Sequence, residues 1–113
     1  MEKVWNYSIM KILFSDNRLE KFIGTLEKSA IAKVLRTIDL LEKFGHQLEM
    51  PHSKKIGSGL FELRVRGEQE IRIFYTFCNG AAVLLHGHVK KTDRIPEREL
   101  STAKKKRRAL DKV

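Results

Sequence analysis

Three arginines lie on one side of a segment that has the pattern of a β-hairpin. Arg64 and Arg66 belong to its first predicted strand, Arg72 belongs to the second, and Gly67-Glu68-Gln69 forms the turn between them. Successive side chains of a strand point to opposite faces, so the arginines share one face and the apolar residues take the other. A guanidinium in the middle of a sheet packs poorly, but it can hold a phosphate through two parallel hydrogen bonds. The pattern indicates a phosphate-binding sheet face.

A third predicted strand adds two histidines to the arginine face. Asn79-Gly80 is a strong hairpin signal, because both central positions of such a turn need a positive φ, and the strand Ala81 to Val89 follows it. Alternation places His86 and His88 beside the arginines, provided that no β-bulge reverses the faces. Either histidine could act as a general base near neutral pH, or could instead satisfy local hydrogen bonds. The opposite, apolar face is predicted to carry Phe61, Leu63, Val65, Ile71, Ile73, Tyr75, Phe77, Val83 and Leu85.

Two amphipathic helices are expected to cover this apolar face. Apolar residues recur at helical spacing from Leu19 to Leu26 and again from Ile31 to Leu41. Ser15-Asp16-Asn17 is a typical helix start, and Gly45 suits a C-terminal cap. The two helices meet near Lys28-Ser29, so they form a helical hairpin.

Three further segments complete the predicted order of elements. Val4 to Phe14 is predicted to be a strand, Gln47 to Ser58 a loop, and the chain after Pro96 a basic helix with a sparse apolar side. Residues 1–113 are expected to form a single domain. The predicted fold class is α+β, with a small antiparallel sheet, the N-terminal strand and helical hairpin on one face, a concave basic opposite face and a basic C-terminal helix.

The positive charge of the chain is concentrated near its end. Six of the nine net charges fall in residues 86–113, which hold 10 basic and 4 acidic groups. This suggests a polyanionic partner, either nucleic acid or an acidic protein, unless the run Lys104 to Arg108 is only a solvated helix surface. A single cysteine, Cys78, excludes an intramolecular disulfide and a cysteine-rich metal site. No apolar run could span a membrane and no signal peptide is visible, so we expect a cytoplasmic protein.

The stretch from Met50 to Lys91 resembles a known protein family. It contains Glu-Leu-Arg at 62–64, Arg-Ile-Phe-Tyr at 72–75 and Leu-Leu-His-Gly at 84–87, followed by a lysine pair. Together these motifs resemble the phage-derived Gp49-like proteins of the RelE/HigB superfamily of type II toxins. The resemblance implies a RelE-like fold and an endoribonuclease that cleaves messenger RNA on the ribosome. It also implies a cognate antitoxin, often with a helix-turn-helix domain, but no cofactor and no membrane partner.

The same resemblance implies a set of site residues. The matching positions are Arg64, Arg72 and Lys91, followed by Lys54, Lys55 and Lys90. Two departures from the family pattern stand out: residues 96–113 contain no tyrosine, and Glu62 takes a position where RelE-type sites tend to have a lysine.

RNA cleavage without a metal requires a proton acceptor for the 2′-hydroxyl, charge stabilisation at the phosphate and a group at the leaving 5′-oxygen. Arg72 is predicted to grip the scissile phosphate, and Arg64 to share that role or to hold the neighbouring phosphate. Lys91, with Lys90, is predicted to stabilise charge at the leaving oxygen. The chain offers neither paired carboxylates nor a His-Glu-x-x-His motif on a helix, so a metal-dependent nuclease is not expected.

Several roles remain open at the level of the sequence. The base is predicted to be His88 or His86, and Arg66 either contacts RNA or forms an ion pair across the hairpin. Phe74 either stacks on a base or covers the sheet beneath the last helix, which we favour. The whole protein could instead be a non-catalytic basic module that binds nucleic acid or docks on an acidic partner.

Overall fold

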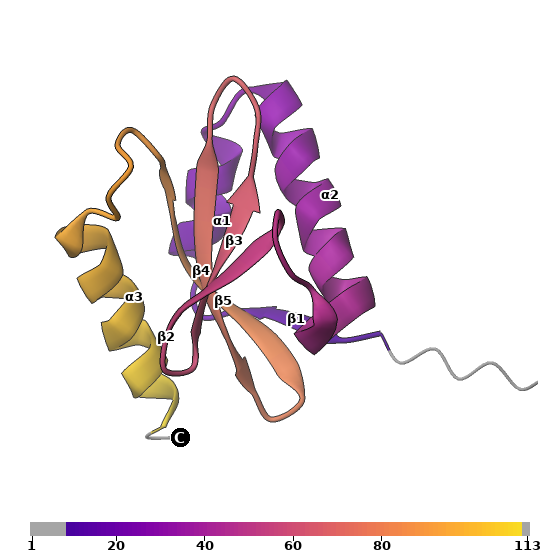
Figure 1. Ribbon diagram of the computed structural model, residues 1–113, viewed down its shortest axis with the longest axis vertical. Coiled ribbons are helices and arrows are strands. Elements are labelled where there is room, and N and C mark those ends of the chain that lie inside the picture. The colour runs from indigo at the N-terminus through magenta and orange to yellow at the C-terminus, as the bar shows by residue number, and fades with distance from the viewer. Residues whose placement is uncertain (1–8, 112–113) are drawn as a thin grey trace, which may run out of the picture.

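The computed structural model describes residues 9–111, so part of the first predicted strand, Val4 to Ser8, lies outside the described residues. None of the helices within this range is both long and apolar enough to cross a membrane. The elements are shown in Figure 1 and run in the order β1 (Lys11–Phe14), α1 (Arg18–Gly24), α2 (Lys28–Phe44), the short 3-10 helix η1 (Gly45–Gln47), β2 (Ser53–Gly57), β3 (Leu60–Val65), β4 (Ile71–Cys78), β5 (Ala81–Val89) and α3 (Glu97–Leu110).

The strands form one mixed sheet in the order β1-β5-β4-β3-β2. Strands β2 to β5 pair antiparallel with their neighbours, whereas β1 pairs parallel with β5. The predicted α+β class is therefore confirmed, with strands β2 to β5 antiparallel, and the N-terminal strand adds one parallel pair at the edge. The physical reason is the connection: α1 and α2 carry the chain across one face of the sheet, and such a crossover permits a parallel pair.

Strand β2 lies within the segment 47–58, which was predicted to be a loop. It pairs antiparallel with β3, with Lys54 opposite Glu62 and Lys55 opposite Phe61. As an edge strand it leaves both lysines exposed to solvent. Polar residues on both faces remove the alternation by which a strand is detected in a sequence, and charged side chains protect such an edge from pairing with other chains.

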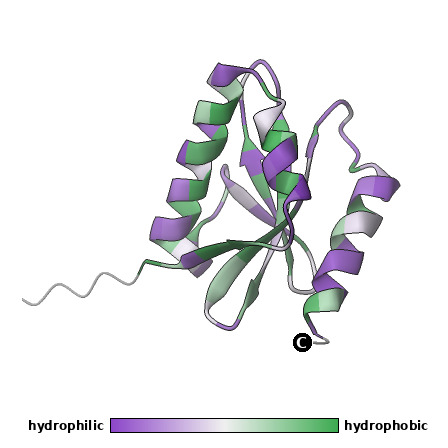
Figure 2. Ribbon diagram, turned by 180° about the vertical axis from the view of Figure 1, so that it is seen from behind, coloured by the Kyte–Doolittle hydropathy of each residue, from purple (hydrophilic) through white to green (hydrophobic). Residues whose placement is uncertain are grey.

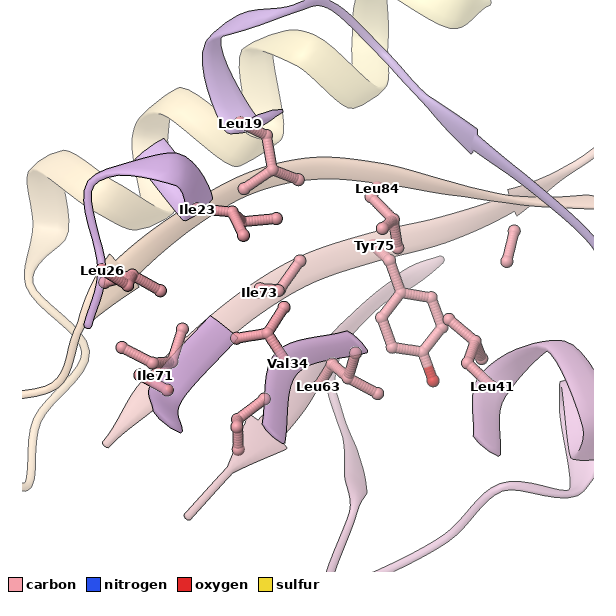
Figure 3. Close-up of a cluster of buried hydrophobic side chains, with 13 residues drawn as sticks. Leu19, Ile23, Leu26, Val34, Leu41, Leu63, Ile71, Ile73, Tyr75 and Leu84 are labelled. Carbon is pink, nitrogen blue, oxygen red and sulfur yellow. The ribbon is translucent and has the colours of Figure 1, made fainter. Parts of the chain in front are cut away.

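The main core lies between the sheet and the helices α1 and α2. Figure 3 shows Leu19 and Ile23 of α1 and Val34 of α2 packing toward Ile73 and Tyr75 of β4. Figure 2 shows hydrophobic and hydrophilic colours alternating along α2, as expected for a helix with one buried stripe. The predicted helical hairpin and the predicted apolar faces of β3 and β4 are confirmed.

A β-bulge in β5 corrects the predicted faces of that strand. Phe74 pairs with His86, but Tyr75 pairs with Leu84, so Leu85 is an extra residue without an opposite partner. Leu84 consequently packs into the core beneath α1 and α2, whereas Leu85 packs against α3. Val83 also lies on the α3 side, so the prediction for both Val83 and Leu85 was wrong. One extra residue reverses every side chain beyond it, and no property of the sequence reveals where it falls.

Helix α3 covers part of the second sheet face and leaves the rest open. Leu60, Phe74 and Leu85 are buried beneath Ala103 of the helix. The favoured prediction that Phe74 covers the sheet is confirmed, because its side chain is fully buried and has no surface on which a base could stack. The helix is also held at its end by Arg107, whose Nε donates to the carbonyl oxygen of Gly59 at 3.2 Å.

Replacing Phe74 with alanine should lower the free energy of unfolding by about 3–5 kcal/mol, because a cavity would open beneath α3. Phe44→Ala is the matched control: the same atoms are removed from a side chain that is 45% exposed, and the loss should not exceed about 1 kcal/mol. Urea unfolding of both variants measures the difference. Equal losses would contradict the assignment of Phe74 to the second core.

Candidate functional site

The register of the sheet aligns polar side chains in two rows on the face shared with α3. In the first row His88 of β5 lies opposite Arg72 of β4, which lies opposite Arg64 of β3. The second row lies two residues further along the strands, nearer to α3. It consists of His86, Phe74, Glu62 and Lys54. Phe74 is covered by the helix, so the polar groups around it mark the boundary between the apolar and the charged half of this face.

A hollow of about 170 Å³ opens over the charged half. Its floor comes from strands β2 to β5, and its wall from the segment that leads from β5 into α3 (Figure 1). Five cationic and two acidic side chains line it, which favours an anionic ligand. The lining residues are Lys54, Ile56, Glu62, Arg64, Arg72, His88, Lys90, Thr92, Asp93, Arg94 and Ile95.

Glu62 is the carboxylate that keeps the two strand arginines together. Its Oε1 lies 3.7 Å from the Nε atoms of both Arg64 and Arg72, and the residue itself is only 5% exposed. The negative carboxylate between the two positive guanidiniums offsets the repulsion that they would otherwise exert on each other. Glu62 therefore fixes the relative position of both arginines.

The two arginines differ in how much of them a ligand could reach. The Arg72 side chain is 2% exposed, and its Nη2 lies 3.3 Å from Glu70 Oε2. Burial lowers the pKa of Arg72 and the Glu62 charge opposes that shift, but a guanidinium stays protonated at neutral pH. The Arg64 side chain is 16% exposed, and its buried Nε has no hydrogen-bond partner within residues 9–111. Arg64 is therefore the arginine placed for direct contact, with the Arg72 charge beneath it.

His88 has the features of a neutral imidazole with one free nitrogen. Its ring stacks on Phe74 with centroids 5.6 Å apart, and its Nδ1 lies 3.3 Å from the carbonyl oxygen of Val89. A carbonyl can only accept, so Nδ1 carries the hydrogen and Nε2 carries the lone pair. That Nε2 is buried without a hydrogen-bond partner in the described part of the chain. Desolvation by burial lowers the pKa of His88, which keeps the ring neutral at pH 7, while the Glu99 charge acts in the opposite direction.

His86 is drawn away from the hollow by α3. Its Nε2 lies 3.2 Å from Glu99 Oε1, and the other oxygen of the same carboxylate lies 3.8 Å from His88 Nδ1. Glu99 thus connects both histidines to the helix, a contact that cannot be predicted from the sequence because it depends on where α3 docks.

The structure brings some of the predicted site residues together and separates others. Those that line the hollow are Lys54, Arg64, Arg72, His88 and Lys90. Those that do not line it are Lys55, Arg66, His86 and Lys91.

The reasons for the separation are specific. Lys55 follows Lys54 on an edge strand, so it projects on the other face. Arg66 lies past the end of β3 and lines a different groove, beside α2. Lys91 lines a separate depression with Phe22 and Arg98. None of these separations is visible without the tertiary structure.

Sequence reasoning missed three charged members of the hollow. Alternation would have placed Glu62 beside Arg64, but its role between two arginines follows only from the strand register. Asp93 and Arg94 belong to a segment without periodicity, which folds back over the sheet. Within residues 9–111 there is no group of three or more metal-ligating side chains.

The depressed pKa of His88 predicts a specific pH dependence of stability. The unfolded chain takes up a proton near pH 6.5, whereas the folded protein resists it. The contribution of His88 to the free energy of unfolding is therefore complete above this pH. It is lost as the pH falls toward the pKa of His88 in the folded protein, by up to about 1.4 kcal/mol per pH unit. Unfolding free energies between pH 5 and 7 should fall less steeply for His88→Gln than for wild type. An NMR titration that puts the His88 pKa at or above 6.5 would refute the assignment.

A comparison with known protein families agrees with the resemblance seen in the sequence. The model of the family described as phage derived protein Gp49-like (DUF891) matches residues 21–108. This range runs from α1 into α3 and contains every residue that lines the hollow. No curated protein sequence matches the chain. Because the family match covers well over half of its length, the chain belongs to the phage-derived Gp49-like family.

Proposed function

We propose that this protein is the toxin of a type II toxin–antitoxin pair of the RelE/HigB superfamily. In this proposal it cleaves messenger RNA at the ribosome without a metal ion, and a cognate antitoxin neutralises it. The observation that carries the proposal is the hollow itself. It combines several cations with one neutral imidazole whose free nitrogen faces no protein partner. Membership of a toxin-like, phage-derived family supports the same reading.

The cations of the hollow are suited to holding a phosphate group. Arg64 and Lys54 lie on adjacent strands and flank Glu62, and Arg94 closes the opposite wall. Charge on the non-bridging oxygens grows in the transition state, so donors fixed in place beforehand contribute more than mobile ones. In the proposed complex Arg64 contacts the scissile phosphate directly, and buried Arg72 adds its positive charge from the floor.

His88 is the proposed general base. Its Nε2 is buried in the free protein, so RNA binding must uncover it. It then takes the proton of the 2′-hydroxyl, the 2′-oxygen forms a bond to phosphorus, and the bond from phosphorus to the 5′-oxygen breaks. The imidazolium formed in this step lies 3.8 Å from Glu99 Oε2, which stabilises its positive charge. A base whose pKa lies below the working pH is neutral and ready to accept a proton.

Lys90 is the proposed group at the leaving 5′-oxygen. It lines the hollow on the same strand end as His88, and its Nζ lies 3.7 Å from Glu70 Oε2. An ammonium in this position can stabilise the alkoxide or donate a proton to it. Lys91, which the sequence favoured for this role, lines a different depression and has no part in the proposed step.

The main alternative is a basic module that binds nucleic acid or an acidic partner without cleaving anything. The same lysines and arginines would serve it, since phosphate contacts alone produce binding that weakens with salt. What distinguishes the enzyme is the buried histidine with an unused acceptor, which a purely electrostatic surface does not need.

Controlled expression in bacterial cells tests the enzymatic part of the proposal. Wild type should arrest growth and create new messenger-RNA ends, and His88→Gln should reduce the cleavage rate by about 10²–10⁴ while RNA binding changes little. Circular dichroism checks that the variant is folded. If wild type creates no new ends, the protein is the non-catalytic module. If the variant cleaves as fast as wild type, His88 is not the base.

Adjacent lysines of β2 give a matched test of where the phosphate binds. Lys54 lines the hollow and Lys55 does not, although both are exposed and lie on the same strand. Lys54→Gln should weaken binding of a 2′-O-methyl dinucleotide by about tenfold, the value of one charge-assisted hydrogen bond. Lys55→Gln should change it less than about twofold. Equal effects of the two substitutions on the dissociation constant would mean that the ligand lies outside the hollow.

A further inference from the structure

We propose that a second phosphate of the same RNA strand binds in a groove between α2 and the end of β3, on the far side of Arg64 from the hollow. This inference rests on the proposed function for the identity of the ligand, a single RNA strand. The groove has a volume of about 220 Å³, somewhat larger than the hollow. The side chains that carry the argument are Lys33, Arg36, His52, Arg64 and Arg66.

The groove exists because β2 is shorter than β3. Ser53, the first residue of β2, pairs with Leu63, and one further bond joins the Arg64 amide to the carbonyl oxygen of His52 at 2.8 Å. Beyond this point β3 has no strand on its β2 side, although Val65 still pairs with Ile71 of β4, so residues 65–66 form an open edge of the sheet. Helix α2 packs against β3 on the other side. The open edge and the helix are the two walls of the groove.

All the charged groups that line this groove are basic. Lys33 and Arg36 lie one helical turn apart on α2, Arg64 lies on β3 and Arg66 follows the end of that strand. No aspartate or glutamate lines it, whereas the hollow contains two. Within residues 9–111, Lys33, Arg36 and Arg66 form no ion pair. Of the four cations only Arg64 forms an ion pair within the described residues, with Glu62 at 3.7 Å. An anion bound in the groove would offset the repulsion among them.

The turn after β3 leaves room for this arrangement. A Cβ atom at Gly67 would lie only 2.8 Å from Lys33 Nζ. The lysine therefore reaches across the glycine from the helix to the hairpin turn. Gly67 itself lines a neighbouring depression rather than the groove; Lys33 lines both, and the depression also contains Glu27 and Glu68.

Arg64 connects the two sites, because it lines both the hollow and the groove. Its Nε makes no hydrogen bond in the described residues and lies 3.7 Å from Glu62 Oε1. Consecutive phosphates of one strand are joined through a single sugar, so two anion sites that share one arginine fit neighbouring phosphates. The strand would pass around the open edge of β3, and contacts of this kind set its position and direction without reading its sequence.

Binding of non-cleavable RNA tests the groove separately from catalysis. The probes are 2′-O-methyl oligoribonucleotides of two and of eight nucleotides, measured by fluorescence anisotropy at several KCl concentrations. The groove variant is Lys33→Gln with Arg36→Gln. The control is Lys28→Gln with Lys43→Gln, which removes the same charge from exposed positions of α2 that line neither site.

The groove variant should bind the octanucleotide at least about tenfold more weakly, with a salt slope smaller by about 0.7 for the one phosphate that it no longer neutralises. Its affinity for the dinucleotide, which fills only the hollow, should stay within about twofold of wild type, as should both affinities of the control. The proposal is overturned if octanucleotide binding is unchanged, if both probes weaken equally, or if poly-glutamate displaces the octanucleotide more readily than RNA does. If binding depends on the groove but the protein creates no messenger-RNA ends, the proposed cleavage is wrong and the proposed phosphate site in the groove still stands.

Discussion

The functional half of this protein depends on one buried carboxylate between two guanidiniums. Glu62 lies equally far from Arg64 and Arg72, and both Glu62 and Arg72 are almost without exposed surface. Two arginines facing each other across adjacent strands would repel and would each need water. The carboxylate lets them remain in the middle of a sheet.

The second sheet face has an apolar half, which must be buried, and a charged half, whose polar groups need partners. Helix α3 contributes to both. Its small residue Ala103 allows close packing over Phe74 and Leu85, which buries the apolar half. Its acidic residue Glu99 reaches the two histidines at the boundary. The bulge at Leu85 is part of the same arrangement, because it supplies an extra apolar residue to α3 and leaves His86 and His88 on the polar side.

The distribution of charge separates two kinds of anion contact. In the hollow, acidic groups accompany the cations and keep them in fixed positions, which suits chemistry at one phosphate. In the groove Lys33, Arg36 and Arg66 form no ion pair within the described residues, which suits attraction of a strand without demanding geometry. A strand that follows both sites would be held by its backbone and presented to His88 at a single linkage.

Local pattern in the sequence determined the helical hairpin, strands β3 and β4, and the face that Arg64, Arg72, His86 and His88 share. Periodicity and turn residues act over a few neighbours, so these features can be read without a structure. Only the tertiary structure decided the edge strand β2, the parallel pairing of β1 and the bulge at Leu85. It also decided which lysines meet the arginines: Lys54 and Lys90 do, whereas Lys55 and Lys91 do not. The reason is that strand register and helix docking arise from packing between distant segments, and a one-residue shift moves a side chain to the opposite face.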